Sequence, residues 1–221
     1  MEITTMAKEV DEGQKIIMKQ SSEHKIPIPD QLPDPDERLY YNQSVKKPKR
    51  KIKSLPIQFG KLTNQNVEQF RILNYLTLPV IYSDDFYERL TNYRRYSILG
   101  YYKDLLVGAI SCRYEDDEET GGRVVYIMTI TVLKAYRRYG IGTQLLKRAM
   151  IDCKAADVKR IYLHVLCSNE SAIEFYKSAN FTIKEKLLDY YTDLDPPHCF
   201  IFERSLEDIT NEQIEQIDAK K

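Results

Sequence analysis

Two closely spaced glycines mark the segment of this chain that is best suited to bind an anion. Gly140 and Gly142 lie in RRYGIGT, residues 137–143, between a β-prone run and an amphipathic helical pattern. Glycine lets the backbone approach a ligand closely, and the free amides and dipole at a helix start attract a negative group such as a pyrophosphate. The segment is neither GxGxxG nor a P-loop, so a dinucleotide or nucleoside triphosphate fits poorly. The structural alternative is a strand-to-helix turn whose glycines serve only tight packing.

Three further side chains could do acid–base chemistry. His164 lies in the alternating run 160–166, and histidine titrates near neutral pH. Tyr126 lies in a β-prone run, and Tyr176 lies near the end of an amphipathic segment. For each of the three, packing within a strand or helix is the structural alternative. The cysteines show no metal-ligand spacing, so we expect reduced thiols and no metal site; they are Cys112, Cys153, Cys167 and Cys199.

Alternating runs bounded by turn residues predict the strands that position these side chains. Residues 115–119 are acidic and precede Gly121 and Gly122, so we expect a hairpin turn there. Residues 78–82 should form a loop, because Pro79 lacks an amide donor and restricts Leu78 to extended geometry. The strands are expected at residues 57–62, 96–102, 105–114, 124–132, 160–166, 181–188 and 199–204.

Four helices are expected between these strands. Thr63 should cap the first helix and Ser83 or Asp84 a short second one that ends near Leu90. The third begins at Gly140, and the fourth covers 169–179 with Ser168 or Asn169 as its cap. The order β-α-α-β-β-β-α-β-α-β-β predicts a mixed α/β fold. The expected apolar positions are Val67, Phe70, Leu73 and Tyr75 in the first helix and Ile141, Leu145, Leu146, Ala149, Met150 and Cys153 in the third.

Composition predicts one domain between two polar tails. The chain has 221 residues, 43% of them hydrophobic, which suffices for one core. Residues 1–56 are polar and rich in proline, so we expect a disordered arm before a domain at 57–205 and a polar tail or helix at 206–221. Within the arm, the basic run Lys46–Lys53 could be a nuclear-import signal, a contact for RNA or the ribosome, or a solvated linker.

Charge and hydropathy limit the classes of partner. Lys+Arg and Asp+Glu both number 33, so net charge favours neither nucleic acid nor an acidic partner as the main ligand. We find no apolar h-region and no run approaching the roughly 18 to 20 apolar residues of a membrane span. We therefore expect a soluble cytoplasmic protein, also nuclear if the basic run is an import signal, with neither specific DNA nor a membrane as partner.

Two motifs resemble those of the GNAT acetyltransferases. Arg137-x-x-Gly140-x-Gly142 matches the family's acetyl-CoA signature, and NESAIEFY, residues 169–176, matches its N-x-x-A-x-x-F/Y-Y pattern. The resemblance implies a central, twisted, mostly antiparallel sheet flanked by helices, with acetyl-CoA as cosubstrate. In that family the glycine turn holds the CoA pyrophosphate and the preceding strand carries the pantetheine. The implied cofactor-binding residues are Thr129, Ile130, Val132, Arg137, Arg138, Gly140, Ile141, Gly142, Thr143, Asn169 and Tyr176.

Further strings resemble one subgroup of that family, the NatE-type catalytic subunits represented by N-alpha-acetyltransferase 50. The resemblance implies acetylation of the α-amine of nascent or mature proteins that keep Met1 before an apolar residue. It also implies association with a NatA-like ribosome-associated complex. The matching strings cross nearly the whole expected domain: LPVIY (78–82), YIMT (126–129), YRRYGIGT (136–143), IYLHV (161–165), SNESAI (168–173) and DYY (189–191).

The same resemblance assigns the acceptor side of the site. Tyr126 and His164 are implied as a catalytic pair that acts through water, and Tyr176 as a donor toward the CoA sulfur. A modest base suffices, because an α-amine has an unperturbed pKa of about 7.7 to 8.0. The implied substrate-binding residues are Leu78, Pro79, Val80, Tyr82, Tyr126, Met128, Tyr190, Tyr191 and Leu194.

The chain also departs from the subgroup pattern. Leu78 stands where a phenylalanine is expected, and both tails are extra, which bears on substrate preference and partners. Two other functions stay open. One is acetylation of lysine side chains or a small amine, which commonly needs a carboxylate that the run 126–132 lacks. The other is a catalytically silent protein of the same fold that docks on ribosomes or chromatin through its basic run.

Overall fold

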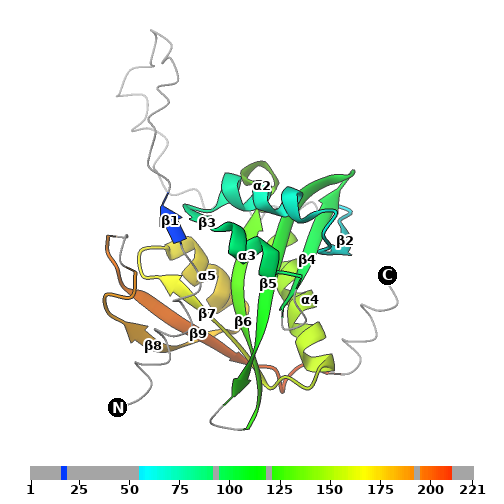
Figure 1. The fold of residues 1–221 in the computed structure, drawn as a ribbon. Coiled ribbons are helices and arrows are strands. Elements are labelled where there is room, and N and C mark those ends of the chain that lie inside the picture. The colour runs from blue at the N-terminus through cyan, green and yellow to red at the C-terminus, as the bar shows by residue number, and fades with distance from the viewer. Residues whose placement is uncertain (1–15, 19–54, 92–94, 118–120, 192–194, 211–221) are drawn as a thin grey trace, which may run out of the picture.

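A seven-stranded sheet forms the centre of the computed structural model, which describes residues 16–18, 55–91, 95–117, 121–191 and 195–210 (Figure 1). The strand order is β2-β4-β5-β6-β7-β9-β8, and every neighbouring pair is antiparallel except β6 and β7. The mixed α/β fold with a mostly antiparallel sheet is thereby confirmed. The strands are β2 (Gln58–Lys61), β4 (Arg95–Tyr102), β5 (Leu105–Asp117), β6 (Gly122–Val132), β7 (Arg160–Leu166), β8 (Thr182–Leu187) and β9 (Cys199–Ser205).

Helices cover both faces of the sheet (Figure 1). On one face, α2 (Val67–Thr77) and α3 (Asp84–Arg89) bury Phe70 and Phe86 against strand residues such as Leu99. On the other face, α4 (Ile141–Ala155) and α5 (Glu170–Ser178) pack over a larger core. The expected apolar face of α4 is buried completely, since Ile141, Leu145, Leu146, Ala149, Met150 and Cys153 all belong to that core.

β6 contains a bulge that changes the phase of its alternation. Ser111 of β5 pairs with Thr129 and Cys112 pairs with Ile127, so Met128 is an extra residue. Ile127 packs in the core beneath α4, and beyond the bulge Ile130 packs there too, three positions later instead of two. Because of the bulge, each side chain after Met128 faces the side of the sheet opposite to the one that uninterrupted alternation would give it.

β6 and β7 pair over only three residues. Tyr126 pairs with Tyr162, and this is the last pair of the parallel ladder that begins at Val124 and Arg160. Beyond it the two strands diverge (Figure 1), and Ile127 and residues 129–132 pair with β5. Among the described residues, no strand pairs with the other side of the backbone in this half of β6.

Several local expectations were wrong. Asn66, not Thr63, precedes the first helix, and Tyr75 is 55% exposed on its outer side. Residues 80–82 form β3 (Val80–Tyr82), where Pro79 led us to expect a loop; the proline lies just before the strand and removes no ladder bond. β3 pairs with β1 (Ile16–Met18), a strand inside the expected disordered arm.

The acidic end of the expected hairpin turn also differs. Glu115, Asp116 and Asp117 belong to β5 and not to the turn, because Arg113 and Arg160 pair with the carboxylates of Glu115 and Asp117. The sequence before and after residue 205 is packed as one core, since Leu206 and Ile209 in the expected tail are buried. The run Lys46–Lys53 lies outside the described residues. None of the helices in the described ranges is long and apolar enough to cross a membrane.

Candidate functional site

Tyr126 and His164 come together where β6 and β7 diverge. The Tyr126 hydroxyl lies 3.3 Å from Nδ1 of His164, although 38 residues separate them in the chain. The ring of Tyr190, from the segment after β8, stacks on the imidazole with centroids 4.6 Å apart and planes 11° apart. The structure therefore brings together three residues that the sequence assigned to catalysis and substrate binding.

Burial sets the protonation of this pair. Desolvation lowers the pKa of His164 to about 4, so the imidazole is neutral at pH 7 and its free lone pair can accept a proton. Nε2 of His164 is buried and has no hydrogen-bond partner among the described residues. Burial also raises the pKa of Tyr126 well above its usual value, and the nearby Tyr190, Tyr191, Tyr82 and Tyr162 raise it further. The site thus presents a neutral base beside a neutral phenol.

The glycine turn is shaped to bind an anion. Gly140 is the N-cap of α4 with a φ of 77°, and Arg138 shares this left-handed backbone with a φ of 70°. A Cβ added at Gly140 would meet no atom within 4 Å, and one added at Gly142 would meet Phe175 at an ordinary 3.6 Å. Internal packing therefore does not require glycine at Gly142, whereas a ligand close to the backbone would. The amides at the start of α4 are available to such a ligand.

The remaining cofactor-binding predictions divide into backbone and side-chain positions. The Ile141 side chain is buried in the core and Thr129 bonds Ser111 at 2.6 Å, so both can offer a ligand only their backbone. Ile130 and Val132 lie on the open half of β6, and the Val132 carbonyl accepts a bond from Nε of Arg137 at 3.0 Å. Thr143 is exposed in the first turn of α4.

Asn169 and Tyr176 lie at opposite ends of α5. Asn169 caps the helix, and its side-chain oxygen accepts from the amide of Ala172 at 3.2 Å. Tyr176 is 4% exposed within a cluster that includes Phe181 and Phe202. Burial raises the pKa of Tyr176, so it stays a neutral hydrogen-bond donor. Both residues thus have a structural role that is independent of any ligand.

The predicted substrate residues lie on several elements, including β3, β6 and the segment after β8. Tyr82 of β3 stacks on Phe86 with centroids 4.3 Å apart, and Met128 of β6 packs against the same core. Leu78 ends α2 and is half-buried, whereas Pro79 is exposed. A cavity of about 190 Å³ lies against β3 and is lined in part by Val80 and Tyr82. Tyr191 contacts Tyr190 edge-on at 4.9 Å, and Leu194 lies outside the described residues.

The sequence reasoning missed three connected residues beside Tyr126 and His164, which are Tyr162, Arg113 and Glu115. Tyr162 contacts the rings of Tyr126 and His164, with centroids 5.1 and 6.2 Å away. Its hydroxyl donates to Glu115, which also binds Arg113. The available signal was the IYLHV string, because Tyr162 lies two positions before His164 and therefore on the same face of β7.

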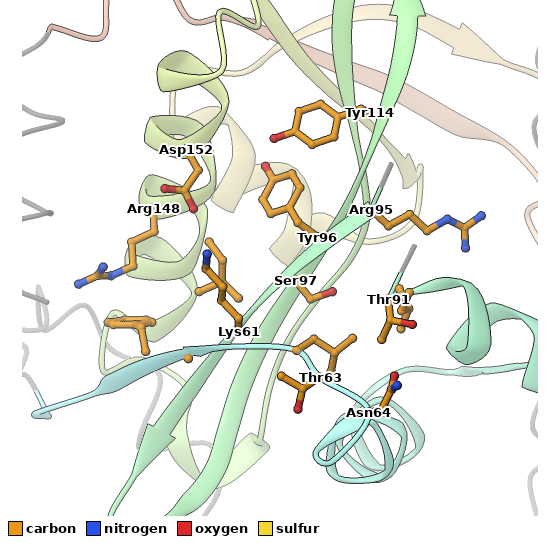
Figure 2. A pocket seen from close by; sticks show the side chains of 15 residues that line it. Lys61, Thr63, Asn64, Thr91, Arg95, Tyr96, Ser97, Tyr114, Arg148 and Asp152 are labelled. Atoms are coloured by element: carbon orange, nitrogen blue, oxygen red, sulfur yellow. The ribbon is translucent and has the colours of Figure 1, made fainter. Parts of the chain in front are cut away.

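A cavity larger than the one beside β3 lies away from Tyr126 and His164. It has a volume of about 910 Å³ and lies between β2, β4 and α4, with Tyr96, Ser97 and Arg148 among its lining residues (Figure 2). Neither Tyr126 nor His164 lines it. Cavity volume alone therefore does not point to the Tyr126–His164 pair. In the described parts of the chain, no group of three or more His, Cys, Asp or Glu side chains could hold a metal ion.

Comparison with known proteins shows the family to which the chain belongs. The family described as "Acetyltransferase (GNAT) family" matches residues 65–181. N-alpha-acetyltransferase 50 of Danio rerio is 38% identical over 151 residues, which cover 68% of this chain and 89% of the relative. The "Probable N-acetyltransferase san" of Drosophila melanogaster is 36% identical over 151 residues, covering 68% of this chain and 81% of that protein.

A solved structure agrees with these relatives. The complex of Arabidopsis thaliana Naa50 with the bisubstrate analogue CoA-Ac-MVNAL superposes with a TM-score of 0.62 at 38% identity. The match covers 67% of this chain and 98% of that one. The glycine turn, the divergence of β6 and β7 and these matches lead to one conclusion: the chain belongs to the GNAT family and is an acetyltransferase that uses acetyl-CoA.

Proposed function

We propose that this enzyme acetylates the α-amine of protein N-termini that keep Met1 before an apolar residue. The observation that carries the proposal is the buried Tyr126–His164 pair, with its hydroxyl 3.3 Å from Nδ1, at the point where β6 and β7 diverge. The Arabidopsis structure supports the choice of acceptor, since its bisubstrate analogue joins CoA to a peptide that begins with Met and Val.

Acetyl-CoA would lie between the glycine turn and the open half of β6. The amides following Gly140 would hold its pyrophosphate, and the charges of Arg137 and Arg138 would favour it. The backbone of residues 129–132 would bond the pantetheine as an added strand does. Acetyl-CoA supplies an activated thioester, and Tyr176 would donate a hydrogen bond to the departing sulfur.

His164 accepts a proton only after the amine nitrogen has bonded to the acetyl carbon. Its pKa of about 4 lies some 4 units below that of a free α-amine, so direct removal of the ammonium proton would cost on the order of 5 kcal/mol. The apolar pocket instead favours entry of the neutral amine. Once the nitrogen bonds to the acetyl carbon its proton becomes far more acidic, and a weak base then suffices. Nε2 of His164 receives that proton as the C–S bond breaks, either directly or through a water bound to the Tyr126 hydroxyl.

The apolar pocket would select the first residues of the substrate. Tyr82 and Met128 form one side and Tyr190 the other, which suits a methionine side chain. Leu78, smaller than the phenylalanine expected there, would leave room for a wider range of apolar second residues. A NatA-like ribosome-associated complex is the proposed partner, and the cytoplasm the proposed location.

Acetylation of lysine is the competing function. A lysine amine, with a pKa near 10.4, needs more help to lose its proton. Glu115 is the nearest carboxylate described above, but its two oxygens bind Arg113 and Tyr162. This pairing neutralises its charge and favours the α-amine as acceptor.

The test is acetyl transfer to a peptide panel with Met-Leu, Met-Val, Met-Lys and Ser-Glu starts, plus a lysine-containing peptide with a blocked N-terminus. We expect turnover of the free Met-Leu and Met-Val peptides. Turnover of the blocked peptide alone would replace the proposal with lysine acetylation. Binding of acetyl-CoA without turnover of any peptide would contradict both.

A further inference from the structure

A closed set of contacts surrounds the catalytic tyrosine on three neighbouring strands. Arg113 of β5 pairs with Tyr126 of β6, which pairs with Tyr162 of β7, so the three residues lie side by side on one face of the sheet. The Arg113 guanidinium lies 5.2 Å from the centroid of the Tyr126 ring, and the Tyr162 ring lies 5.1 Å from it on the other side. Tyr126 is therefore held between a cation and a second ring.

Glu115 closes this arrangement. It lies two residues beyond Arg113 on β5, and its Oε1 accepts from Nε of Arg113 at 2.9 Å. Its Oε2 accepts from the hydroxyl of Tyr162, two strands away. The Arg113 and Glu115 side chains are only 15% and 19% exposed, so water competes little for these bonds.

We propose that Arg113, Glu115 and Tyr162 form a positioning clamp that holds the Tyr126 hydroxyl against Nδ1 of His164. The proposal rests on the proposed catalytic roles of Tyr126 and His164. Among the described residues, the Tyr126 hydroxyl makes a hydrogen bond only to His164, and at 3.3 Å this bond is long. Such a bond alone leaves the ring free to tilt. The clamp restricts the ring from both sides, so the hydroxyl stays within reach of the imidazole.

The clamp also keeps the catalytic histidine uncharged. An unpaired carboxylate near His164 would favour the imidazolium, whereas Arg113 balances the charge of Glu115. Tyr162, Tyr126 and Tyr190 surround the imidazole with rings at 6.2, 5.5 and 4.6 Å. The pairing and the rings together preserve the neutral base that the reaction requires.

The test uses Tyr162→Phe and Glu115→Gln, which keep the size of each side chain and remove the charged hydrogen bond. We expect each to lower kcat on a Met-Leu peptide about 10-fold, with the KM for acetyl-CoA within about 2-fold of wild type. The double variant should be little worse than either single one, because both remove the same bond. Additive losses, or an unchanged kcat in both variants, would overturn the clamp.

A matched control comes from the same strand and face. Asp117 is ion-paired with Arg160 at 2.8 Å, and we expect Asp117→Asn to lower Tm while kcat stays within about 2-fold. An equal loss of kcat in this control would mean that any damaged ion pair on β5 slows the enzyme, which contradicts positioning.

A second readout does not depend on turnover. NMR titration of the His164 ring in the full chain should show its midpoint, about 4, moving toward 6.5 in Tyr162→Phe by at least about 0.5 unit as the site loosens. An unmoved midpoint would overturn the clamp. If wild type acetylates only the blocked lysine peptide, the proposed function fails, and the kcat comparison on that peptide together with the titration still decides the clamp.

Discussion

Acid should lower the free energy of unfolding in part through protonation of His164, and substitution of this histidine should remove that part. The folded-state pKa is about 4 and the unfolded value about 6.5, so the unfolded chain binds more protons between these values. Stability is therefore full above about pH 6.5 and falls as the pH drops toward 4. The 2.5-unit difference corresponds to about 3.4 kcal/mol in the acid limit, and to about 2 kcal/mol at pH 5.

Urea unfolding at pH 7.5, 6.5, 5.5 and 5.0 measures this effect in wild type and in His164→Gln. Other groups also respond to acid, so the useful quantity is the difference between the two proteins, which cancels shared contributions. We expect this difference to change by about 2 kcal/mol between pH 7.5 and pH 5, with wild type losing more. Parallel loss in both proteins would refute the idea that burial keeps His164 neutral, and with it the late role of the imidazole.

Four further substitutions test separate parts of the site and the domain. Gly140→Ala should lower acetyl-CoA affinity in calorimetry and cost about 1 kcal/mol in urea unfolding, because its φ of 77° disfavours a side chain. Tyr126→Phe should lower kcat, while equilibrium dialysis shows acetyl-CoA binding largely unchanged, because Tyr126 lies outside the glycine turn; equal loss of binding would contradict this. Asn169→Ala should cost about 1 kcal/mol in urea unfolding by removing the α5 cap. Leu206→Ala should cost about 2 to 5 kcal/mol in the same assay, because Leu206 is fully buried; a neutral result would mean that Leu206 contributes nothing to the packing of the core.

The sequence predicted most accurately the helices and strands whose buried side chains recur at one regular spacing along the chain. α4 buries every position that the helical pattern selected, and β7 runs from Arg160 to Leu166 as expected. In both cases the side chains that face the core recur at the spacing of the backbone, so local pattern and tertiary packing agree.

Two of the wrong expectations share a physical cause, which is pairing with distant residues. Glu115 and Asp117 favour a turn by composition, but Tyr162 and Arg160 of β7 bind their carboxylates and keep them in β5. Residues 80–82 become a strand because β1 offers a partner more than 60 residues away. The bulge at Met128 likewise interrupts the period of β6, and no residue type in that run marks it.

The Tyr126–His164 pair shows why a motif alone cannot define such a site. Tyr126 and His164 each fit a packing role, and only the parallel register of β6 and β7 makes them neighbours. In that register Tyr126 pairs with Tyr162, so His164 lies diagonally opposite, within reach of a phenol. Tyr126 and Tyr162 form the last pair of the β6–β7 ladder, so the strands diverge where the Tyr126 hydroxyl meets the His164 imidazole. A shift of the β6–β7 register by two residues would separate Tyr126 from His164. The same shift would move the point on β6 where the two strands diverge. The register therefore fixes the position of the proposed base relative to the backbone proposed to bind the cosubstrate.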